Sequence, residues 1–297
     1  MFNLEGIYAP IPAPFTSRNG PLDFDGLSKN MEFWNQSNLD GLVVLGSNGE
    51  FVAMNEREKK ELVKAVCGQR SPGKGIVVGC GFENTKDSIM LCEYSASVGA
   101  NAALVLSPCY YKSSMTEKVL SDFFTEVADA SPIPIVLYNM PGNSGINLSS
   151  SLVASLAVHP NIIGVKDSSG NIVQIMEIIR DTDESFSVFA GSASFLLPTL
   201  IAGGNGGTLA LANVLPNECA KLYRLVNEGN IPEAVALQLH LLEANKAVTA
   251  KYGIGGLKAA MEIIGYCGGS PRSPLPLLGD ADRQALKKII EAAQTAY

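Results

Sequence analysis

The sequence predicts an α/β fold, a (β/α)8 TIM barrel with a C-terminal helical extension. The first observation is a set of short apolar segments, rich in β-branched residues, each followed by a helical stretch. The second is that nearly every position in these segments is apolar, which is typical of parallel strands covered by helices on both faces. The third is their number and their spacing of roughly 25 to 30 residues, which match this barrel. A doubly wound sheet is the alternative, but it usually has fewer strands, and no G-x-G-x-x-G follows the first strand.

Each repeat of the predicted barrel joins one strand to one helix. The predicted strands are Ile7–Ile11, Gly41–Leu45, Gly75–Val78, Ala102–Leu106, Pro134–Tyr138, Ile162–Lys166, Phe186–Ala190 and Gly207–Leu211. The predicted helices are Asp25–Asn38, Asn55–Gln69, Asn84–Val98, Thr116–Ala130, Ser149–Val158, Asn171–Asp181, Ser192–Ala202 and Pro216–Glu228. Asn55 with Glu58 three residues later is the pattern of a capping box, and Pro216 and Gly229 suit a helix start and a helix end.

Three more helices are expected after the eighth repeat, at Ile231–Tyr252, Gly256–Ile264 and Asp280–Ala296. Residues 1–229 are therefore interpreted as the barrel, and residues 230–297 as a small helical subdomain packed on it. No low-complexity linker separates the two parts, so independent motion is not indicated.

Composition excludes several classes of protein. Hydrophobic residues make up 46% of the 297 residues and charged residues 17%, so a large core can form and general disorder is excluded. The net charge is -7 and no Lys/Arg cluster stands out, which argues against a nucleic-acid partner. No apolar run of about 18 residues is present, so no membrane helix is expected. A small anionic substrate remains compatible, because a few local donors can hold it.

Cysteines and histidines narrow the chemistry and the compartment. The six cysteines form no C-x-x-C pair, which favours a reducing compartment. The start of the sequence carries no secretory pattern, so we expect the cytoplasm, with the mitochondrial matrix as the alternative if a transit peptide is missing here. The only histidines, His159 and His240, are interpreted as structural, which argues against a histidine-ligated zinc site and a Ser-His-Asp triad. We therefore expect neither a metal ion nor a cofactor.

Catalytic groups of such a barrel lie at the carboxyl ends of the strands and in the loops that follow. The candidates there are the turn Gly46-Ser47-Asn48-Gly49-Glu50, the loop Ser107–Tyr111, the strand end Tyr138-Asn139-Met140-Pro141, the strand end Lys166-Asp167-Ser168 and the loop Gly191-Ser192. The turn after the second strand exposes N–H groups suited to a carboxylate, although its glycines also suit an ordinary turn. The glycine-rich run 203–207 precedes the eighth strand, so it is interpreted as a tight turn at the other end.

Lys166 is the strongest candidate for a nucleophile. It ends an apolar strand, where a lysine held away from water can supply the neutral amine that attacks a ketone. A surface lysine leaving the sheet is the alternative. No histidine pair, metal-ligand cluster or reactive-looking cysteine competes for the role.

These motifs resemble the dihydrodipicolinate synthase and N-acetylneuraminate lyase family of class I aldolases, and the resemblance covers the whole chain. It rests on Gly46–Glu50, Tyr138–Pro141 and Gly164–Gly170 in that order. The resemblance implies a (β/α)8 barrel, a pyruvate Schiff base on Lys166 and a homotetramer.

Three positions favour a subfamily. Asn143 stands where those synthases carry an arginine for the second substrate's carboxylate, and Ser47-Asn48 stands where they typically have Thr-Thr. These positions, with Pro108–Tyr111 and the tail stretch 248–258, look similar to 4-hydroxy-2-oxoglutarate aldolases and to sugar-acid aldolases that release pyruvate.

The resemblance implies a set of roles. Tyr138 moves the proton of the C4 hydroxyl, and Ser47 with Tyr111, the latter from a neighbouring subunit, completes a proton relay. The N–H groups of Ser47 and Asn48 hold the pyruvyl carboxylate. The residues expected at the rest of the substrate are Asn143, Ser168 and Gly191. The hypothesis is cleavage of 4-hydroxy-2-oxoglutarate to pyruvate and glyoxylate. The alternatives are condensation of pyruvate with aspartate semialdehyde, a 2-keto-3-deoxy sugar-acid aldolase, and a pyruvate-binding barrel without turnover.

Overall fold

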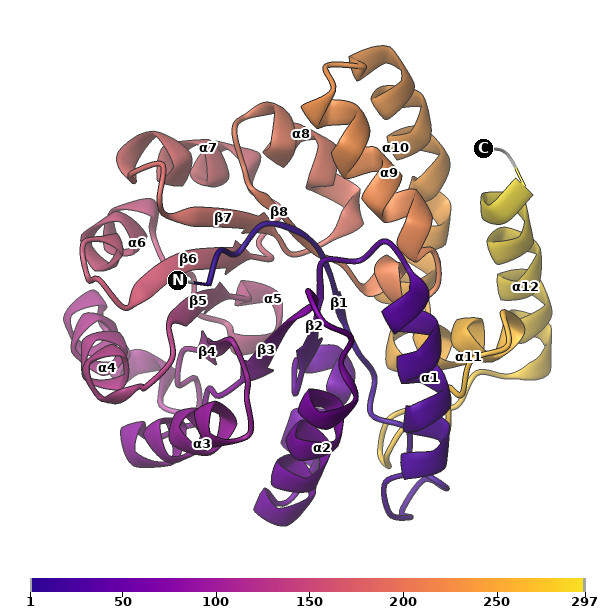
Figure 1. Cartoon of the computed structure of the whole chain (residues 1–297), viewed down its shortest axis with the longest axis horizontal. Helices are drawn as coiled ribbons and strands as arrows, with labels where there is room; N and C mark the ends of the chain where they lie inside the picture. The colour runs from indigo at the N-terminus through magenta and orange to yellow at the C-terminus, as the bar shows by residue number, and fades with distance from the viewer. Residues whose placement is uncertain (1, 296–297) are drawn as a thin grey trace.

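Eight parallel strands close into a barrel in the computed structural model, which describes residues 2–295 (Figure 1). The strands are β1 (Gly6–Pro10), β2 (Gly41–Val44), β3 (Gly75–Gly79), β4 (Ala102–Leu106), β5 (Ile135–Asn139), β6 (Ile162–Asp167), β7 (Ser187–Ala190) and β8 (Gly206–Thr208). Each strand pairs with its neighbours in sequence, and β8 pairs with β1. The predicted TIM barrel is confirmed.

The eighth strand is shorter than predicted. It ends at Thr208 instead of Leu211, and Ala210–Asn213 form a 3₁₀ turn. The side-chain amide of Asn213 donates to the carbonyls of Pro10 and Ala210, at 3.0 and 3.1 Å. Because this amide occupies the carbonyl of Pro10 at the end of β1, the chain turns away instead of extending the ladder.

The predicted barrel helices are present as a ring around the strands (Figure 1). They are α1 (Phe24–Gln36), α2 (Glu56–Gln69), α3 (Thr85–Ser97), α4 (Glu117–Ala130), α6 (Ser150–Ala157), α7 (Ile172–Asp181), α8 (Leu196–Ile201) and α9 (Pro216–Asn227). Side chains cap the first turns of six of them, and α2 has the predicted capping box between Asn55 and Glu58. Such a cap satisfies backbone N–H groups that have no partner inside the helix.

Two segments differ from the prediction within the barrel. The predicted helix Ser192–Ala202 is divided into a 3₁₀ turn at Ala193–Phe195 and α8, because the backbone of Phe195 (φ -129°) is not helical. A four-residue helix, α5 (Pro141–Ser144), follows β5 and was not predicted.

The chain continues into the helices α10 (Ile231–Lys246), α11 (Gly253–Ile263) and α12 (Asp280–Thr295). A π-helical turn at Ala247–Lys251 interrupts the helix predicted over Ile231–Tyr252, where the Thr249 hydroxyl donates to the carbonyl of Asn245 at 2.6 Å. A side chain that bonds the helix backbone in this way commonly accompanies such a distortion. The predicted end of the last helix, Ala296, lies outside the described residues, and the boundary between residues 229 and 230 stays a prediction.

Two apolar clusters hold these layers together. The smaller one fills the inside of the barrel and includes Tyr8, Val43, Leu104, Tyr138 and Phe189. The larger one lies between the strands and the helices. Side chains alternate along a strand, so every second side chain of β5 and β6 points into the barrel and the others pack against the helices. No helix among the described residues is both long and apolar enough to cross a membrane.

Candidate active site

Lys166 and Tyr138 lie side by side at the carboxyl ends of β6 and β5. The two residues are paired in the strand register, and Lys166 is paired with Phe189 of β7 on its other side. Lys166 is 4% exposed and Tyr138 5% exposed. The Lys166 Nζ lies 4.1 Å from the centroid of the Tyr138 ring. An amine and a phenol are therefore held together inside the barrel by two rigid strands.

Ser47 extends this pair toward the turn after β2. Its Oγ lies 3.2 Å from the Tyr138 hydroxyl, so a proton can pass between the two oxygens. Ser47 begins a 3₁₀ turn that ends at Gly49. The N–H groups of Gly49 and Glu50 close the turn onto the carbonyls of Gly46 and Ser47. The N–H groups of Ser47 and Asn48 come first in the turn and have no partner within it.

Left-handed backbone flanks this turn on both sides. Leu45 has φ +59° and Glu50 has φ +56°, and both are non-glycine residues. Each such residue costs about 1 kcal/mol or more and persists where the surroundings hold it in place. Strain of this kind clusters at functional sites, and here it fixes the direction in which the turn presents its N–H groups.

The environment lowers the pKa of Tyr138. Burial by itself raises the pKa of this phenol, but the positive charge of Lys166 and hydrogen bonds with Ser47, Lys166 and Ser168 together outweigh it. A phenol whose pKa lies below its ordinary value gives up its proton more readily, as a general base or acid near neutral pH requires.

The structure brings some of the other predicted residues together. Ser168 follows β6, and a Cβ built on Gly191 would lie only 1.9 Å from the Ser168 Oγ. Only a glycine at position 191 therefore leaves room for this hydroxyl. Asn143 lies on α5 and is exposed. Tyr111 is 69% exposed, and its ring packs edge-to-face on Tyr110 with centroids 5.1 Å apart. The Tyr138 hydroxyl has a hydrogen bond with Ser47 of the same chain.

Sequence reasoning missed a buried network behind Lys166. The Asp167 carboxylate accepts from the side chains of Asn139 at 2.8 Å and Gln174 at 2.9 Å, and from the N–H of Ser169 at 2.8 Å. Asn139 in turn accepts from the N–H of Leu148 at 3.0 Å. Because this carboxylate has its full set of donors, it locks the ends of β5 and β6 and the loop after β5. A polar residue directly after each of Tyr138 and Lys166 was the signal available in the sequence.

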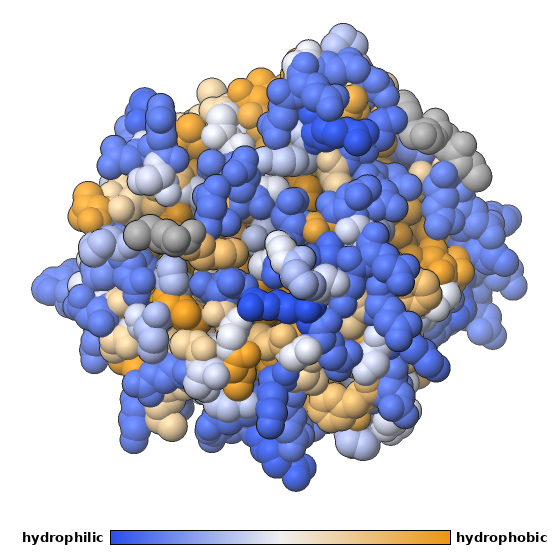
Figure 2. Space-filling model, viewed as in Figure 1, coloured by the Kyte–Doolittle hydropathy of each residue, from blue (hydrophilic) through white to orange (hydrophobic). Residues whose placement is uncertain are grey.

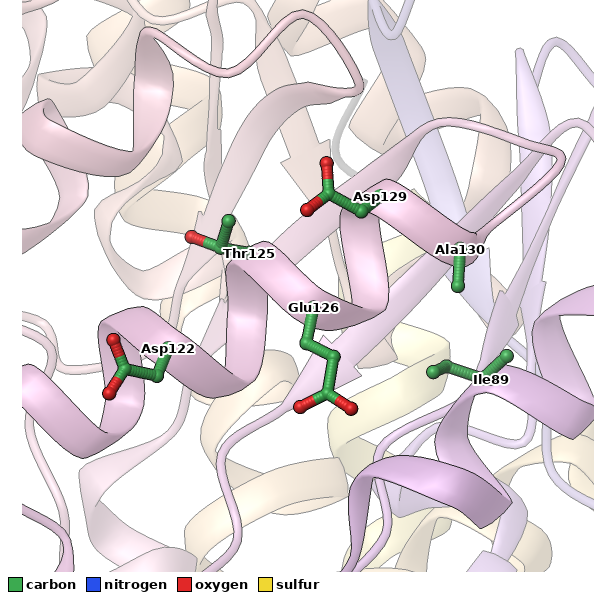
Figure 3. Close-up of a pocket in the computed structure, with 6 residues that line it drawn as sticks. All are labelled: Ile89, Asp122, Thr125, Glu126, Asp129 and Ala130. Carbon is green, nitrogen blue, oxygen red and sulfur yellow. The ribbon is translucent and has the colours of Figure 1, made fainter.

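A surface hollow lies elsewhere and contains none of the predicted site residues. It is lined by Asp122, Thr125, Glu126, Asp129 and Ala130 of α4 and by Ile89 of α3. In Figure 3, Glu126 and Ala130 extend toward the side of Ile89, whereas Thr125 and Asp129 extend away from it. A small, mostly apolar hollow adjoins Tyr138, lined by Leu45, Gly46, Phe51, Gly79, Gly81, Leu104 and Leu106. No group of three or more potential metal ligands from His, Cys, Asp or Glu occurs within residues 2–295.

Comparison with known proteins identifies the family of this barrel. The sequence profile described as the dihydrodipicolinate synthetase family matches residues 3–293. The chain belongs to the dihydrodipicolinate synthetase family. Its predicted membership is thereby confirmed, and the site at the ends of β5 and β6 lies within the matched part.

Curated members of the dihydrodipicolinate synthetase family carry different activities at the same level of identity. A probable mitochondrial 4-hydroxy-2-oxoglutarate aldolase of Emericella nidulans is 36% identical over 95% of this chain and 93% of its own length. A 4-hydroxy-tetrahydrodipicolinate synthase of Methanoculleus marisnigri is 36% identical over 96% and 98%. An L-threo-3-deoxy-hexylosonate aldolase of Hypocrea jecorina is 36% identical over 97% and 95%. Identity alone therefore leaves the substrate open.

A solved structure of the dihydrodipicolinate synthetase family superimposes over almost the whole chain. The dihydrodipicolinate synthase DapA-2 of Bacillus anthracis has a TM-score of 0.93 at 27% identity, and the match covers 98% of this chain and 99% of the other. The C-terminal helices are included in that coverage, so they belong to the common architecture.

Proposed function

We propose that this protein is a class I aldolase that cleaves 4-hydroxy-2-oxoglutarate to pyruvate and glyoxylate through a Schiff base on Lys166. The observation that carries the proposal is the contiguous row of Lys166, Tyr138 and Ser47, in which amine, phenol and hydroxyl adjoin at 4.1 and 3.2 Å. Family membership supports it, because relatives named as aldolases match 95% and 97% of the chain.

The proposed reaction uses only groups of the protein and water. The neutral amine of Lys166 attacks the C2 carbonyl of the substrate. The Tyr138 phenol then gives its proton to the departing hydroxyl, so that water leaves and an iminium on Lys166 and a phenolate on Tyr138 remain. The Tyr138 phenolate takes the proton of the C4 hydroxyl as the C3–C4 bond breaks, and the bonding electrons move toward the iminium nitrogen. Glyoxylate leaves, the resulting enamine is protonated at C3 through Tyr138 and Ser47, and water releases pyruvate from Lys166.

The remaining predicted residues complete the proposed site. The N–H groups of Ser47 and Asn48 receive the pyruvyl carboxylate. Ser168, Asn143 and Gly191 lie toward the rest of the substrate. We further propose a homotetramer in which Tyr111 enters the relay of a neighbouring subunit, since its ring is exposed in the single chain. The six thiols are free, which supports the cytoplasm as the compartment.

Two other reactions are kept as alternatives, together with a pyruvate-binding barrel that has lost turnover. Condensation of pyruvate with aspartate semialdehyde is disfavoured by Asn143, because asparagine supplies neither the charge nor the forked geometry of an arginine. Cleavage of a 2-keto-3-deoxy sugar acid is supported by the relative from Hypocrea jecorina.

Borohydride trapping tests the proposed chemistry directly. Addition of borohydride with pyruvate should leave a reduced pyruvyl adduct on Lys166, detected by intact mass and peptide mapping, and EDTA should leave activity intact. Lys166→Ala should fold, lose the adduct and lose nearly all activity. An adduct on another lysine, or none, contradicts the assignment. A substrate panel of 4-hydroxy-2-oxoglutarate, sugar acids and N-acetylneuraminate, with the condensation run alongside, separates the alternatives.

A further inference from the structure

Glu50 is a buried carboxylate that directly follows the Ser47–Gly49 turn and takes no part in the proposed reaction. It is 2% exposed, and its backbone is left-handed. The same residue ends the 3₁₀ turn that presents the N–H groups of Ser47 and Asn48 and begins the next one. The position of its side chain therefore bears directly on the shape of the turn.

The partners of the Glu50 carboxylate come from the far end of the chain. The Lys258 Nζ of α11 lies 2.5 Å from one carboxylate oxygen, and the backbone N–H of Arg272 donates to the other at 2.7 Å. The remaining donors of the Lys258 ammonium bind the carbonyls of Ala13 at 2.8 Å and Ser270 at 2.9 Å. This cation is 1% exposed, and it combines two hydrogen bonds to carbonyls with the ion pair to Glu50.

The Arg272 side chain extends the same connection to α2. Its guanidinium pairs with both carboxylate oxygens of Glu58, at 2.5 and 2.8 Å, and lies 4.1 Å from the centroid of the Phe15 ring. The Lys258 Nζ lies 4.7 Å from the same centroid. The segment from Lys258 to Arg272 thus joins the loop after β1, the turn after β2 and the start of α2.

This arrangement explains how the strained backbone at Glu50 is maintained. A left-handed glutamate is unfavourable by itself, so the conformation persists only if its surroundings determine it. A buried carboxylate that loses its cation is unfavourable as well, so the side chain stays with Lys258. The ion pair and the N–H of Arg272 fix the side chain, and the side chain in turn fixes the backbone of the turn.

We propose that Lys258 and Arg272 are positioning residues that act through Glu50 to hold the Ser47-Asn48 turn in the shape that receives the substrate carboxylate. This inference rests on the proposed function, in which that turn binds the carboxylate. We therefore expect that removing the contacts of Glu50 with Lys258 and Arg272 weakens the binding of pyruvate far more than it slows the chemical steps at Lys166.

The experiment measures the pyruvate concentration that gives half-maximal borohydride trapping on Lys166, and kcat with saturating substrate, in three variants. Glu50→Gln keeps the shape of the side chain and removes its charge. Glu50→Asn suits a left-handed backbone better than glutamate does, but its shorter amide carries no charge and falls short of Lys258. Lys258→Met removes the cation and retains most of its volume.

We expect Glu50→Asn and Lys258→Met to raise the half-saturating pyruvate concentration by about tenfold or more, since a charge-assisted hydrogen bond contributes roughly that much or more to affinity. We expect Glu50→Gln to lie between them and the wild type, and kcat to stay within about threefold. The double variant Glu50→Gln with Lys258→Met leaves no buried charge unpaired, so it should regain thermal stability and still bind pyruvate weakly.

Two control variants separate positioning from general stability. Leu286→Ala opens a cavity at a fully buried position of α12, so it should lower the melting temperature without a change in half-saturation. Glu262→Gln removes an ion pair with Arg283 in the same C-terminal region, 2.8 Å long and partly exposed, and should change neither quantity much.

The outcomes distinguish this inference from the function on which it rests. If wild type is trapped and Glu50→Asn shows the wild-type half-saturation, the inference is overturned and the proposed function stands. The same holds if Leu286→Ala weakens binding equally, or if the double variant regains full affinity. Should Lys258→Met fail to fold, the two Glu50 variants decide. If wild type gives no adduct, the proposed function is overturned and the inference with it.

Discussion

Tyr138 is the single residue whose surroundings are best matched to a chemical role. Its phenol is buried, its pKa is lowered, and its neighbours are an amine on one side and a hydroxyl on the other. Burial alone would raise the pKa, so its lowering depends on the arrangement of Lys166, Ser47 and Ser168 around the phenol. A phenol in this setting is adapted to exchange a proton.

Tyr138→Phe should lower kcat by about 10² to 10⁴, the usual contribution of a general acid or base, with a modest change in KM. Steady-state kinetics on the cleavage reaction measure this, and a pyruvyl adduct on Lys166 in the variant shows that the amine still works. Tyr8→Phe is the matched control, because Tyr8 is also inside the barrel but pairs with Gly41 at the opposite end of the strands. Activity of Tyr138→Phe within threefold of wild type means that the proton takes another route.

Asn143→Arg should shift the protein toward condensation with aspartate semialdehyde. The arginine adds the charged, forked contact that asparagine lacks, and a charge-assisted hydrogen bond of about 1.5 to 3 kcal/mol corresponds to roughly ten- to a hundredfold in kcat/KM. The wild type should cleave 4-hydroxy-2-oxoglutarate with the higher kcat/KM of the two reactions. Asn143→Gln lengthens the side chain without adding charge and serves as the control. A faster condensation by wild type contradicts the subfamily assignment and leaves the chemistry on Lys166 intact.

The elements of the barrel could be predicted from sequence because their signals are local. Apolar runs and capping residues repeat along the chain, and they placed all eight strands and the helices between them. The helix α5 was not predicted, because a segment of four residues is too short to show a helical period of apolar residues. The ion pair of Glu50 with Lys258 was not predicted for a different reason. It joins residues far apart in sequence, and the sequence alone does not show which charged residues lie together in the folded chain.

The site was predicted less completely than the fold. The neighbouring positions of Lys166, Tyr138 and Ser47 follow from the rule that strand ends meet at one rim, and the structure brings these three together. The network of Asp167 lies on the helix-facing side of the sheet. In the sequence, a polar residue at the end of a strand does not show which side chains it will contact there. The place of Tyr111 in the relay stays a prediction, because it depends on a second subunit.

The first turn of α2 should be sensitive to acid through Glu58. The hydrogen bond from Arg272 lowers the pKa of this carboxyl, although burial opposes the effect. A carboxyl whose pKa is lowered by folding stabilises the protein above its unfolded pKa, near 4.3, and loses that contribution as pH falls through the folded pKa.

Glu58→Gln should therefore lower the melting temperature at pH 7, and its difference from wild type should narrow as pH falls below about 4, where wild-type Glu58 is itself neutralised. Thermal melts across this range measure both effects. Glu56→Gln in the same turn is the control, since Glu56 pairs only with Lys60 at the surface and should change little. A difference between Glu58→Gln and wild type that is constant with pH contradicts the electrostatic explanation.

At the scale of the whole molecule, closure of the parallel barrel brings the carboxyl ends of all eight strands to one rim. On the face seen in Figure 2, hydrophobic residues are scattered among polar ones. Tyr110 and Tyr111 are adjacent aromatic residues beside the rim, and they are 78% and 69% exposed. Large exposed rings commonly mark a contact between proteins, which agrees with the proposed contribution of Tyr111 to a neighbouring site.

Mixing two variants that are each expected to be inactive tests whether Tyr111 contributes to the site of a neighbouring subunit. Lys166→Ala removes the amine, and Tyr111→Phe removes the relay hydroxyl. If Tyr111 acts in the neighbouring subunit, a hybrid of the two variants contains one site with both groups, and random mixing within pairs restores up to about a quarter of wild-type activity. Kinetics on the co-expressed and separately expressed variants measure the gain, and sedimentation gives the oligomeric state. No recovery in verified hybrids indicates that Tyr111 acts within its own chain or not at all.

The short helix α5 has a consequence for how this protein can change its substrate. The backbone of α5 is held by its own contacts: the Ser144 hydroxyl lies 3.0 Å from the carbonyls of Met140 and Ile146, and Gly145 ends the helix with φ +68°. The Asn143 side chain, by contrast, is exposed, and the contacts that hold the backbone of α5 are made by Ser144. Exchange of this side chain should cost little stability, whereas exchange of Lys166 or Tyr138 disturbs a packed interior. In the proposed site, a single mutation at position 143 should therefore change the substrate while Lys166 and Tyr138 stay in place.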